Sequence, residues 1–513
     1  MTRPTRRVIA VAVAAVAVAA MAAAPGCKQK KSGMAAPPPD VPAEAKIEML
    51  ILPAKGDAID LRVLFTTGSV DDPAGREGLT ALTASLMAEG GTESHPYPEL
   101  LDLLYPMAAE IDVQVDKEMT VFSSRVHRDH LDAFLPLLAD VITHPAFDAK
   151  AFDRLKTDQI NYIDKGLRQE NDEQLGIQAL DLWLHEGDPY GHLVEGTMKG
   201  VGAILPSDVR DHWGKVFTRD RMVVGMAGAV DESVAAKVKE AFEDLAEKGS
   251  PRVEVPAAKA VSGVHVRIIQ KETDSTAISM GFPLPVGRDH EDFHALWMAQ
   301  SALGEHRQST GLLFQTIREK RGLNYGDYAY IEPYVRHGEV TKPVLNIGRR
   351  NHDFSVWVRP VQAKHGLFAI RIAFWALDGF ARNGLDAGML DRSKGFLEGY
   401  TRVFEDSADR RLGYALDDLF YGAEDEAFLE AAREAFQALT LDQVNAAVKE
   451  HLGVANMKVV IVTRDAEGLK KALSEGAKAE IAYDTPKPAD VLDQDKEIAG
   501  FDPGFKADWI EVV

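Results

Sequence analysis

Arg318 and Tyr325 are the residues whose types and spacing best suit chemistry on a peptide. Leu313 and Ile317 lie four residues apart and therefore share one helix face. Gly322 predicts the end of this helix, and the aromatic run from Tyr325 predicts a strand. A guanidinium and a phenol would then lie together, where both can donate hydrogen bonds to a developing oxyanion. By spacing alone, the simpler interpretation is a helix-end arginine that solvates the last carbonyls beside a packed tyrosine.

Metal-ligand residue types lie close together in one other stretch, where His185 and Glu186 precede His192. The glycines and the proline between them predict a loop, so no two ligands are held four residues apart on a helix. The other histidines considered as ligands are scattered and are expected at the surface or at helix ends: His127, His130, His144, His290, His294 and His306. We therefore expect this chain to bind no metal and to carry no cofactor.

The composition is that of an ordinary soluble globular protein, with 46% hydrophobic and 27% charged residues. A length of 513 residues suits two or more domains. The formal net charge of −21 argues against a nucleic-acid partner, because phosphate binding needs clustered Lys and Arg.

An internal repeat organises the chain. Phe147–Arg154 recurs as Leu385–Arg392, with the two Asp-Arg ends aligned. A strand, a loop and a helix precede each copy: Leu61–Thr67 then Gly78–Glu89, and Ala277–Phe282 then Asp292–Leu303. Another strand and helix follow each copy. Because the strands are apolar at successive positions and the helices are amphipathic, we predict an α+β fold with two similar domains, each a sheet covered by helices.

Composition also predicts where the domains begin and end. A stretch rich in Gly, Pro and small residues separates the two halves and is typical of a linker. We place the first domain at residues 46–248, the linker at 249–263 and the second domain at 264–480. Prolines and an acidic run then predict an extended C-terminal tail over residues 481–513.

Residues 1–26 have the pattern of a secretory signal peptide. Three arginines precede the apolar run Val8–Ala24, and small residues follow it up to Cys27. Cys27 is the only cysteine, so no disulfide can form within one chain. Residues 27–45, rich in proline and in small or charged residues, would be a flexible tether. If nothing is attached to Cys27, the chain would instead be a plain secreted protein with a spare thiol.

The stretch around Arg318 and Tyr325 resembles the insulinase-type zinc peptidases, also called pitrilysin-like or inverzincin peptidases. In that family an arginine followed seven residues later by a tyrosine holds the substrate. The resemblance covers roughly residues 46–480 and implies two similar α+β domains that form half of a clamshell around a peptide chamber. Four such domains close the chamber, so a second chain is implied.

The family's zinc site is the point at which this sequence departs from the pattern. The family has His-x-x-Glu-His on the helix after the first strand, and here Ala81 and Ser85 stand at the two histidines and Ala84 at the glutamate. The later glutamate ligand aligns with Tyr162 or its neighbour Asn161. An alanine methyl can neither bind a metal nor move a proton, so the resemblance implies that zinc belongs to a partner.

The leading hypothesis is a catalytically silent, substrate-binding subunit of a heteromeric zinc metalloendopeptidase. A homologous partner would supply the zinc, and Arg318 and Tyr325 would hold a peptide or unfolded protein substrate. The alternative is a non-enzymatic envelope scaffold that keeps the peptidase fold. A self-sufficient peptidase with other ligands is disfavoured, because no His/Glu pair was found to replace the lost one.

The N-terminus adds an expected location. Cys27 after the small residues resembles the acylation site of a bacterial lipoprotein, although Ala24 stands where such sites usually carry leucine. Lys28 rather than aspartate after the cysteine resembles the pattern of outer-membrane sorting. These resemblances imply a protein in the cell envelope, lipid-anchored to the outer membrane on its periplasmic face.

Overall fold

The computed structural model describes residues 47–333, 342–423 and 427–513. The predicted signal peptide and tether, with Cys27, lie outside these residues. Within the described residues, no helix combines the length and the apolar composition needed to cross a membrane.

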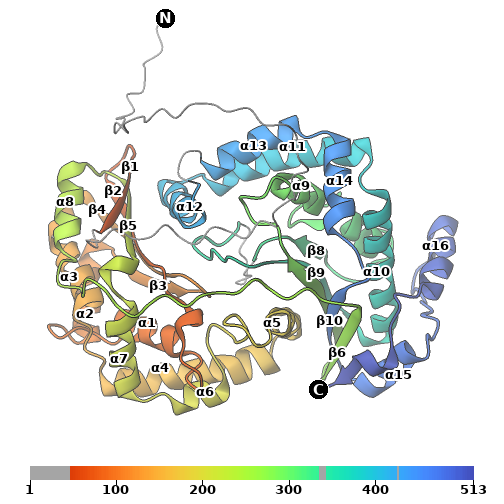
Figure 1. The fold of residues 1–513 in the computed structure, drawn as a ribbon, viewed down its shortest axis with the longest axis horizontal. Coiled ribbons are helices and arrows are strands. Elements are labelled where there is room, and N and C mark those ends of the chain that lie inside the picture. Colours follow the sequence, from red (N-terminus) through yellow and green to blue (C-terminus); the bar gives the residue numbers. More distant parts are fainter. Residues whose placement is uncertain (1–46, 334–341, 424–426) are drawn as a thin grey trace, which may run out of the picture. The chain divides into compact units, whose positions relative to one another are not determined.

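The first half folds as a five-stranded sheet with helices packed on it (Figure 1). Its strands are β1 (Glu48–Pro53), β2 (Ala58–Phe65), β3 (Ile111–Val115), β4 (Thr120–His127) and β5 (Met222–Gly228). Its helices are α1 (Leu79–Glu89), α2 (Tyr97–Leu104), α3 (Leu131–Thr143), α4 (Ala149–Asn161), a π-helix (Tyr162–Gln169), α5 (Asp172–Leu184), α6 (Met198–Ala203), α7 (Pro206–Val216) and α8 (Glu232–Glu240).

The second half folds as a six-stranded sheet with its own helices. Its strands are β6 (Val264–Gln270), β7 (Ser275–Leu284), β8 (Asp327–Tyr330), β9 (His352–Gln362), β10 (Met457–Thr463) and β11 (Ile510–Val512). Its helices are α9 (Phe293–Gly304), a π-helix (Phe314–Glu319), α10 (Gly366–Asn383), α11 (Ala387–Phe404), α12 (Ala408–Tyr421), α13 (Phe428–Ala438), α14 (Leu441–His451), α15 (Ala466–Ser474) and α16 (Ala489–Gly500). Residues 249–262, between the halves, contain no helix or strand.

The two sheets have one topology. The first has the order β1-β5-β2-β4-β3, and the second repeats it as β6-β10-β7-β9-β8 with β11 added outside β6. In both sheets the first pair is parallel and the other equivalent pairs are antiparallel. The predicted α+β fold with two similar sheet-and-helix halves is therefore confirmed.

The recurring segment begins a helix in both halves. Asp148 is the N-cap of α4, and its carboxylate accepts from the backbone N–H groups of Lys150 and Ala151. Asp386 is the N-cap of α11 and accepts from the N–H of Met389. An aspartate oxygen satisfies N–H groups that have no partner inside a helix, which explains why the same residue recurs at both places.

Each half also covers the other half's sheet. Helix α12 places Leu412 and Leu416 against Leu64, Val121 and Ala227 of the first sheet. In turn, α5 packs against the second sheet, where its apolar residues surround the fully buried Val460. Because alternate strand residues face opposite sides, a sheet covered on both faces has apolar residues at successive positions, as these strands do.

The predicted extended tail is wrong. Residues 489–500 form α16, which buries Val491 and Ile498, and β11 adds a parallel strand to β6. The buried Asp495 accepts from Arg321 Nε at 2.8 Å. The acidic composition predicted an extended segment. The helix is nevertheless buried on one side, because its Asp495 forms an ion pair with the distant Arg321.

Candidate functional site

Helix α1 has lost the chemistry of a zinc site. Ala81 and Ser85 lie four residues apart on one half-buried face, and Ala84 is fully buried. The helix starts at Gly78, whose φ of +99° favours glycine. Two methyl groups and a neutral hydroxyl supply neither the ligands for zinc nor a base for water.

Tyr162 stands at the start of the π-helix and is 40% exposed. Burial, together with the nearby charge of Glu195, raises the pKa of its hydroxyl to about 12. At neutral pH this side chain is therefore a neutral phenol, whereas the family's third ligand is an ionised carboxylate. The four positions together do not fit zinc.

His185, Glu186 and His192 are not brought into a common ligand set. His185 is buried with Nε2 2.9 Å from an oxygen of Asp353 and Nδ1 3.3 Å from an oxygen of Asp188. Burial by itself lowers its pKa, but these carboxylates outweigh burial and set the pKa at about 10. His185 is therefore a buried cation whose two ring nitrogens already face carboxylates. His192 instead places Nδ1 2.8 Å from the Leu193 carbonyl oxygen.

Arg318 and Tyr325 lie together at the surface of the second half. Arg318 Nη1 donates to the Tyr325 carbonyl oxygen at 3.3 Å. The guanidinium carbon lies 4.6 Å from the centre of the Phe314 ring and 5.3 Å from that of Tyr325, both within cation–π range. Tyr325 is 77% exposed, so the interpretation as a packed tyrosine does not hold.

The turn between Arg318 and Tyr325 is stabilised by two glycines and by hydrogen bonds of Asn324. Gly322 and Gly326 have φ values of +69° and +147°, which allow the tight reversal. Asn324 Nδ2 donates to Asp327 Oδ1 at 2.6 Å and to the Arg359 carbonyl oxygen at 3.0 Å. Burial raises the pKa of Asp327 to about 8. The prediction that Tyr325 starts a strand is off by two residues, because β8 begins at Asp327.

Two neighbouring arginines of the second half, Arg349 and Arg350, are bound to the first half. Arg349 is buried, and its guanidinium lies 2.8 and 3.2 Å from the two oxygens of Asp116 and 3.2 Å from Asp181. Arg350 pairs with Glu118 at 3.1 Å. These contacts fix the β3–β4 turn against the segment that enters β9, so the arginines hold the two halves together.

Lys117, between the two acidic residues of that turn, is also buried. Its Nζ donates to the carbonyl oxygens of Tyr190, at 2.9 Å, and His192. Burial lowers its pKa, and the charge of Asp181, 3.8 Å away, acts in the opposite sense. The cluster thus alternates acidic and basic groups and keeps each charge paired.

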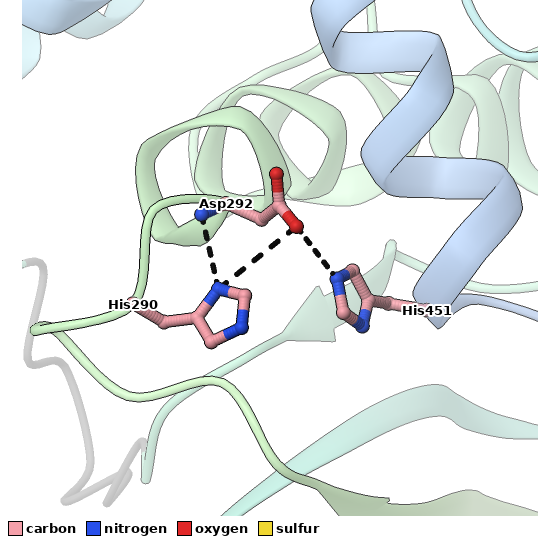
Figure 2. Close-up of side chains that lie close together, drawn as sticks. All are labelled: His290, Asp292 and His451. Carbon is pink, nitrogen blue, oxygen red and sulfur yellow. Dashed lines mark hydrogen bonds and ion pairs between the residues drawn. The ribbon is translucent and has the colours of Figure 1, made fainter. Parts of the chain in front are cut away.

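One cluster was missed by the sequence analysis. Figure 2 shows His290 and Asp292 beside His451, which comes from α14. His290 is expected at the surface or at a helix end by default, and it lies three residues before the start of α9, whereas His451 is not among the histidines considered from the sequence. His290 and His294 are spaced four apart in sequence, but α9 begins at Phe293, so the two do not share a helix face.

Comparison with known proteins identifies the family to which this fold belongs. A family profile described as insulinase, peptidase family M16, matches residues 51–179, and one described as the peptidase M16 inactive domain matches residues 204–357. An uncharacterised zinc protease of Mycobacterium bovis is 24% identical over 420 residues, which cover 80% of this chain and 89% of the relative.

Two solved structures have the same fold. The peptidase M16 inactive domain from Pseudomonas fluorescens superposes with a TM-score of 0.72 at 22% identity, covering 82% of this chain and 96% of the other. A chain of complex III2 from Candida albicans superposes with a TM-score of 0.66 at 12% identity, covering 82% and 94%. The two profiles together span most of the first half and continue into the second, as far as β9. The chain belongs to the insulinase family of peptidases, family M16.

Proposed function

We propose that this chain is a catalytically silent, substrate-binding subunit of a heteromeric zinc metalloendopeptidase. A partner of the same family would supply the zinc and its general base. One observation carries the proposal: Ala81, Ala84 and Ser85 offer no metal ligand at the zinc-site positions of α1, whereas Arg318 and Tyr325 are intact, adjacent and accessible.

The pair suits a peptide backbone. A guanidinium is a permanent cation with five N–H donors, and a phenol adds one more donor. Donors that are already oriented stabilise a tetrahedral oxyanion more than the planar carbonyl from which it forms. Arg318 is held by Phe314 and by the Tyr325 backbone, so it is oriented before a peptide arrives.

The same proposal includes a place in the cell. Cys27 would be acylated after removal of residues 1–26 and would anchor the chain to the periplasmic face of the outer membrane, with residues 27–45 as the tether. Support for this part comes from the sequence pattern alone. Mass spectrometry of the N-terminal peptide from native membranes tests it, and an unmodified Cys27 thiol there would contradict it.

The test of function starts from the tagged protein purified from its own membranes. Chelator-sensitive cleavage of a quenched peptide is measured for the wild type and for the double variant Arg318→Ala with Tyr325→Phe. The matched control is Arg382→Ala with Tyr105→Phe, an exposed arginine and an exposed tyrosine outside the proposed site.

Co-purification of a zinc-bearing M16 partner, with cleavage that collapses only in the double variant, supports the proposal. A preparation that cleaves equally well without the pair contradicts the proposed role of Arg318 and Tyr325. A stable but inert complex points to the scaffold alternative, since a chain of complex III2 from Candida albicans has this fold.

A further inference from the structure

A compact group of nitrogen and oxygen ligands lies in the second half, away from α1. His290 precedes α9, Asp292 is the N-cap of that helix, and His451 is the last residue of α14 (Figure 2). The helices bring together residues 159 positions apart in the chain.

The distances suit a shared ion. Asp292 Oδ2 lies 2.9 Å from His451 Nε2 and 3.9 Å from His290 Nδ1. One ligand atom from each residue lies within 4.8 Å of the other two. Tetrahedral zinc with bonds of about 2.1 Å separates its ligand atoms by about 3.4 Å, between the two measured distances. The cluster therefore needs only small side-chain rotations to close on a metal.

Asp292 is not used as a helix cap. In the described residues, four other aspartates at N-cap positions accept backbone N–H groups of their own helices. The Asp292 carboxylate accepts none from α9 and faces the two imidazoles instead. An N-cap aspartate normally stabilises its helix by accepting backbone N–H groups. In this orientation α9 lacks that stabilisation, and the carboxylate contacts the histidines instead.

The surroundings favour a cation. The three side chains are between 11% and 28% exposed, so water and ions can reach them. Their sequence neighbours include the exposed acidic residues Asp289, Glu291 and Glu450.

The other His–Asp cluster in the described residues, Asp181 with His185 and Asp353, has a different character. There both ring nitrogens of His185 face carboxylates, and Arg349 and Lys117 already neutralise Asp181. Around Asp292, the ion pairs are those with His290 and His451, and Arg288, two residues before His290, pairs with Glu332 instead at 2.7 Å.

We propose that His290, Asp292 and His451 bind a divalent transition-metal ion, with Zn²⁺ the best fit. Two imidazoles and one carboxylate are ligand types that zinc prefers, and water would complete the tetrahedron. His290 Nδ1 now accepts the Asp292 N–H at 3.0 Å, so its proton is on Nε2 when the ring is neutral. Coordination through Nδ1 would exchange this hydrogen bond for a metal bond and fasten α9 to α14.

The experiment titrates metal-free full-length protein with Zn²⁺ by calorimetry and with Co²⁺ by visible absorption, since four-coordinate Co²⁺ gives an intense band. Asp292→Asn, His290→Gln and His451→Gln each keep a side chain that can hydrogen-bond. The control is His127→Gln with His130→Gln, which removes two neighbouring histidines beside Asp129 at the surface of the first half. Unfolding midpoints without metal are measured in parallel to establish that each variant folds.

One Zn²⁺ per chain is expected, with affinity reduced about tenfold or more in each of the three variants and unchanged in the control. Zinc should raise the unfolding midpoint of the wild type and of the control only. Absence of saturable binding, or a site that survives all three substitutions, would overturn the proposal. Because Ala81 and Ser85 replace the family's two histidines, zinc bound by the isolated chain cannot be assigned to the family's catalytic position.

Discussion

The two halves begin their first long helix in different ways, although their sheets have one topology. At α1, the Asp72 carboxylate accepts from the N–H groups of Gly78, at 2.6 Å, and Thr80, at 2.7 Å. The Thr80 hydroxyl lies 2.8 Å from Nε2 of His212, which is buried. At α9 the aspartate turns away from the helix and faces two half-buried histidines. The carboxylate near the start of the helix thus caps the helix in the first half and faces imidazoles in the second.

The chemistry of the family is divided in the same way. The first half keeps the helix of the zinc site but fills it with Ala81, Ala84 and Ser85. The second half keeps Arg318 and Tyr325 on a braced turn. A repeated fold can thus change one set of side chains and keep another, because each set is a few residues rather than the sheet.

The largest loss of stability is expected for Arg349→Ala, which removes ion pairs between the two halves. This change leaves the buried carboxylate of Asp116 without its cation and leaves the half-buried Asp181 with Lys117 alone, and we expect a loss of about 3–5 kcal/mol in the free energy of unfolding. Chemical denaturation measures it. Arg464→Ala, which removes an exposed pair with Asp274, should cost about 1 kcal/mol or less. Equal losses in the two variants would show that the cluster does not join the halves.

The reciprocal packing is tested next by Leu412→Ala. Leu412 is fully buried between α12 and the first sheet, so truncation should cost about 2–5 kcal/mol. Leu101→Ala, at a 47% exposed position on α2, is the matched control and should change stability by about 0.5 kcal/mol or less. If Leu412→Ala resembled this control, α12 would not cover the first sheet in solution.

Two buried histidines should give opposite dependences of stability on pH. The carboxylates around His185 raise its pKa from 6.5 to about 10, so its stabilising contribution is complete below pH 6.5 and is lost as pH rises toward 10. Burial lowers the pKa of His212 from 6.5 to about 4, so stability is lost as pH falls from 6.5 toward 4.

Unfolding free energies measured across this pH range for wild type, His185→Gln and His212→Gln would separate the two contributions. The difference between wild type and His185→Gln should shrink toward pH 10, and the difference for His212→Gln should shrink toward pH 4. A difference that stays constant over the stated range would contradict the corresponding assignment.

The smallest effect on stability is expected for Arg318→Ala with Tyr325→Phe. Both side chains contact mainly each other and Phe314, and Tyr325 is largely exposed, so the free energy of unfolding should change by about 1 kcal/mol or less. Comparing this loss with that of Arg349→Ala distinguishes an arginine that is not needed for folding from one that stabilises the fold. A loss as large as that of Arg349→Ala would favour a packing role for the pair.

Features that depend on local pattern could be predicted from the sequence. Three features depend only on residues close together in the sequence: the repeat around Asp148 and Asp386, the alternation of strands and helices, and the substitutions at the zinc-site positions. The repeat also predicted that strands and helices follow one another in the same order along both halves. The Arg318–Tyr325 contact was also predictable, because a helix end and a short turn place the two residues together.

Contacts between distant segments could not be predicted in this way and are known from the structure alone. Arg349 meets Asp116 across 233 positions, and Arg321 fixes α16 through Asp495 across 174. His451 meets Asp292 through the packing of α14 on α9. Short-range periodicity carries no information about such pairs, since they arise when whole helices and sheets bury their apolar faces against one another.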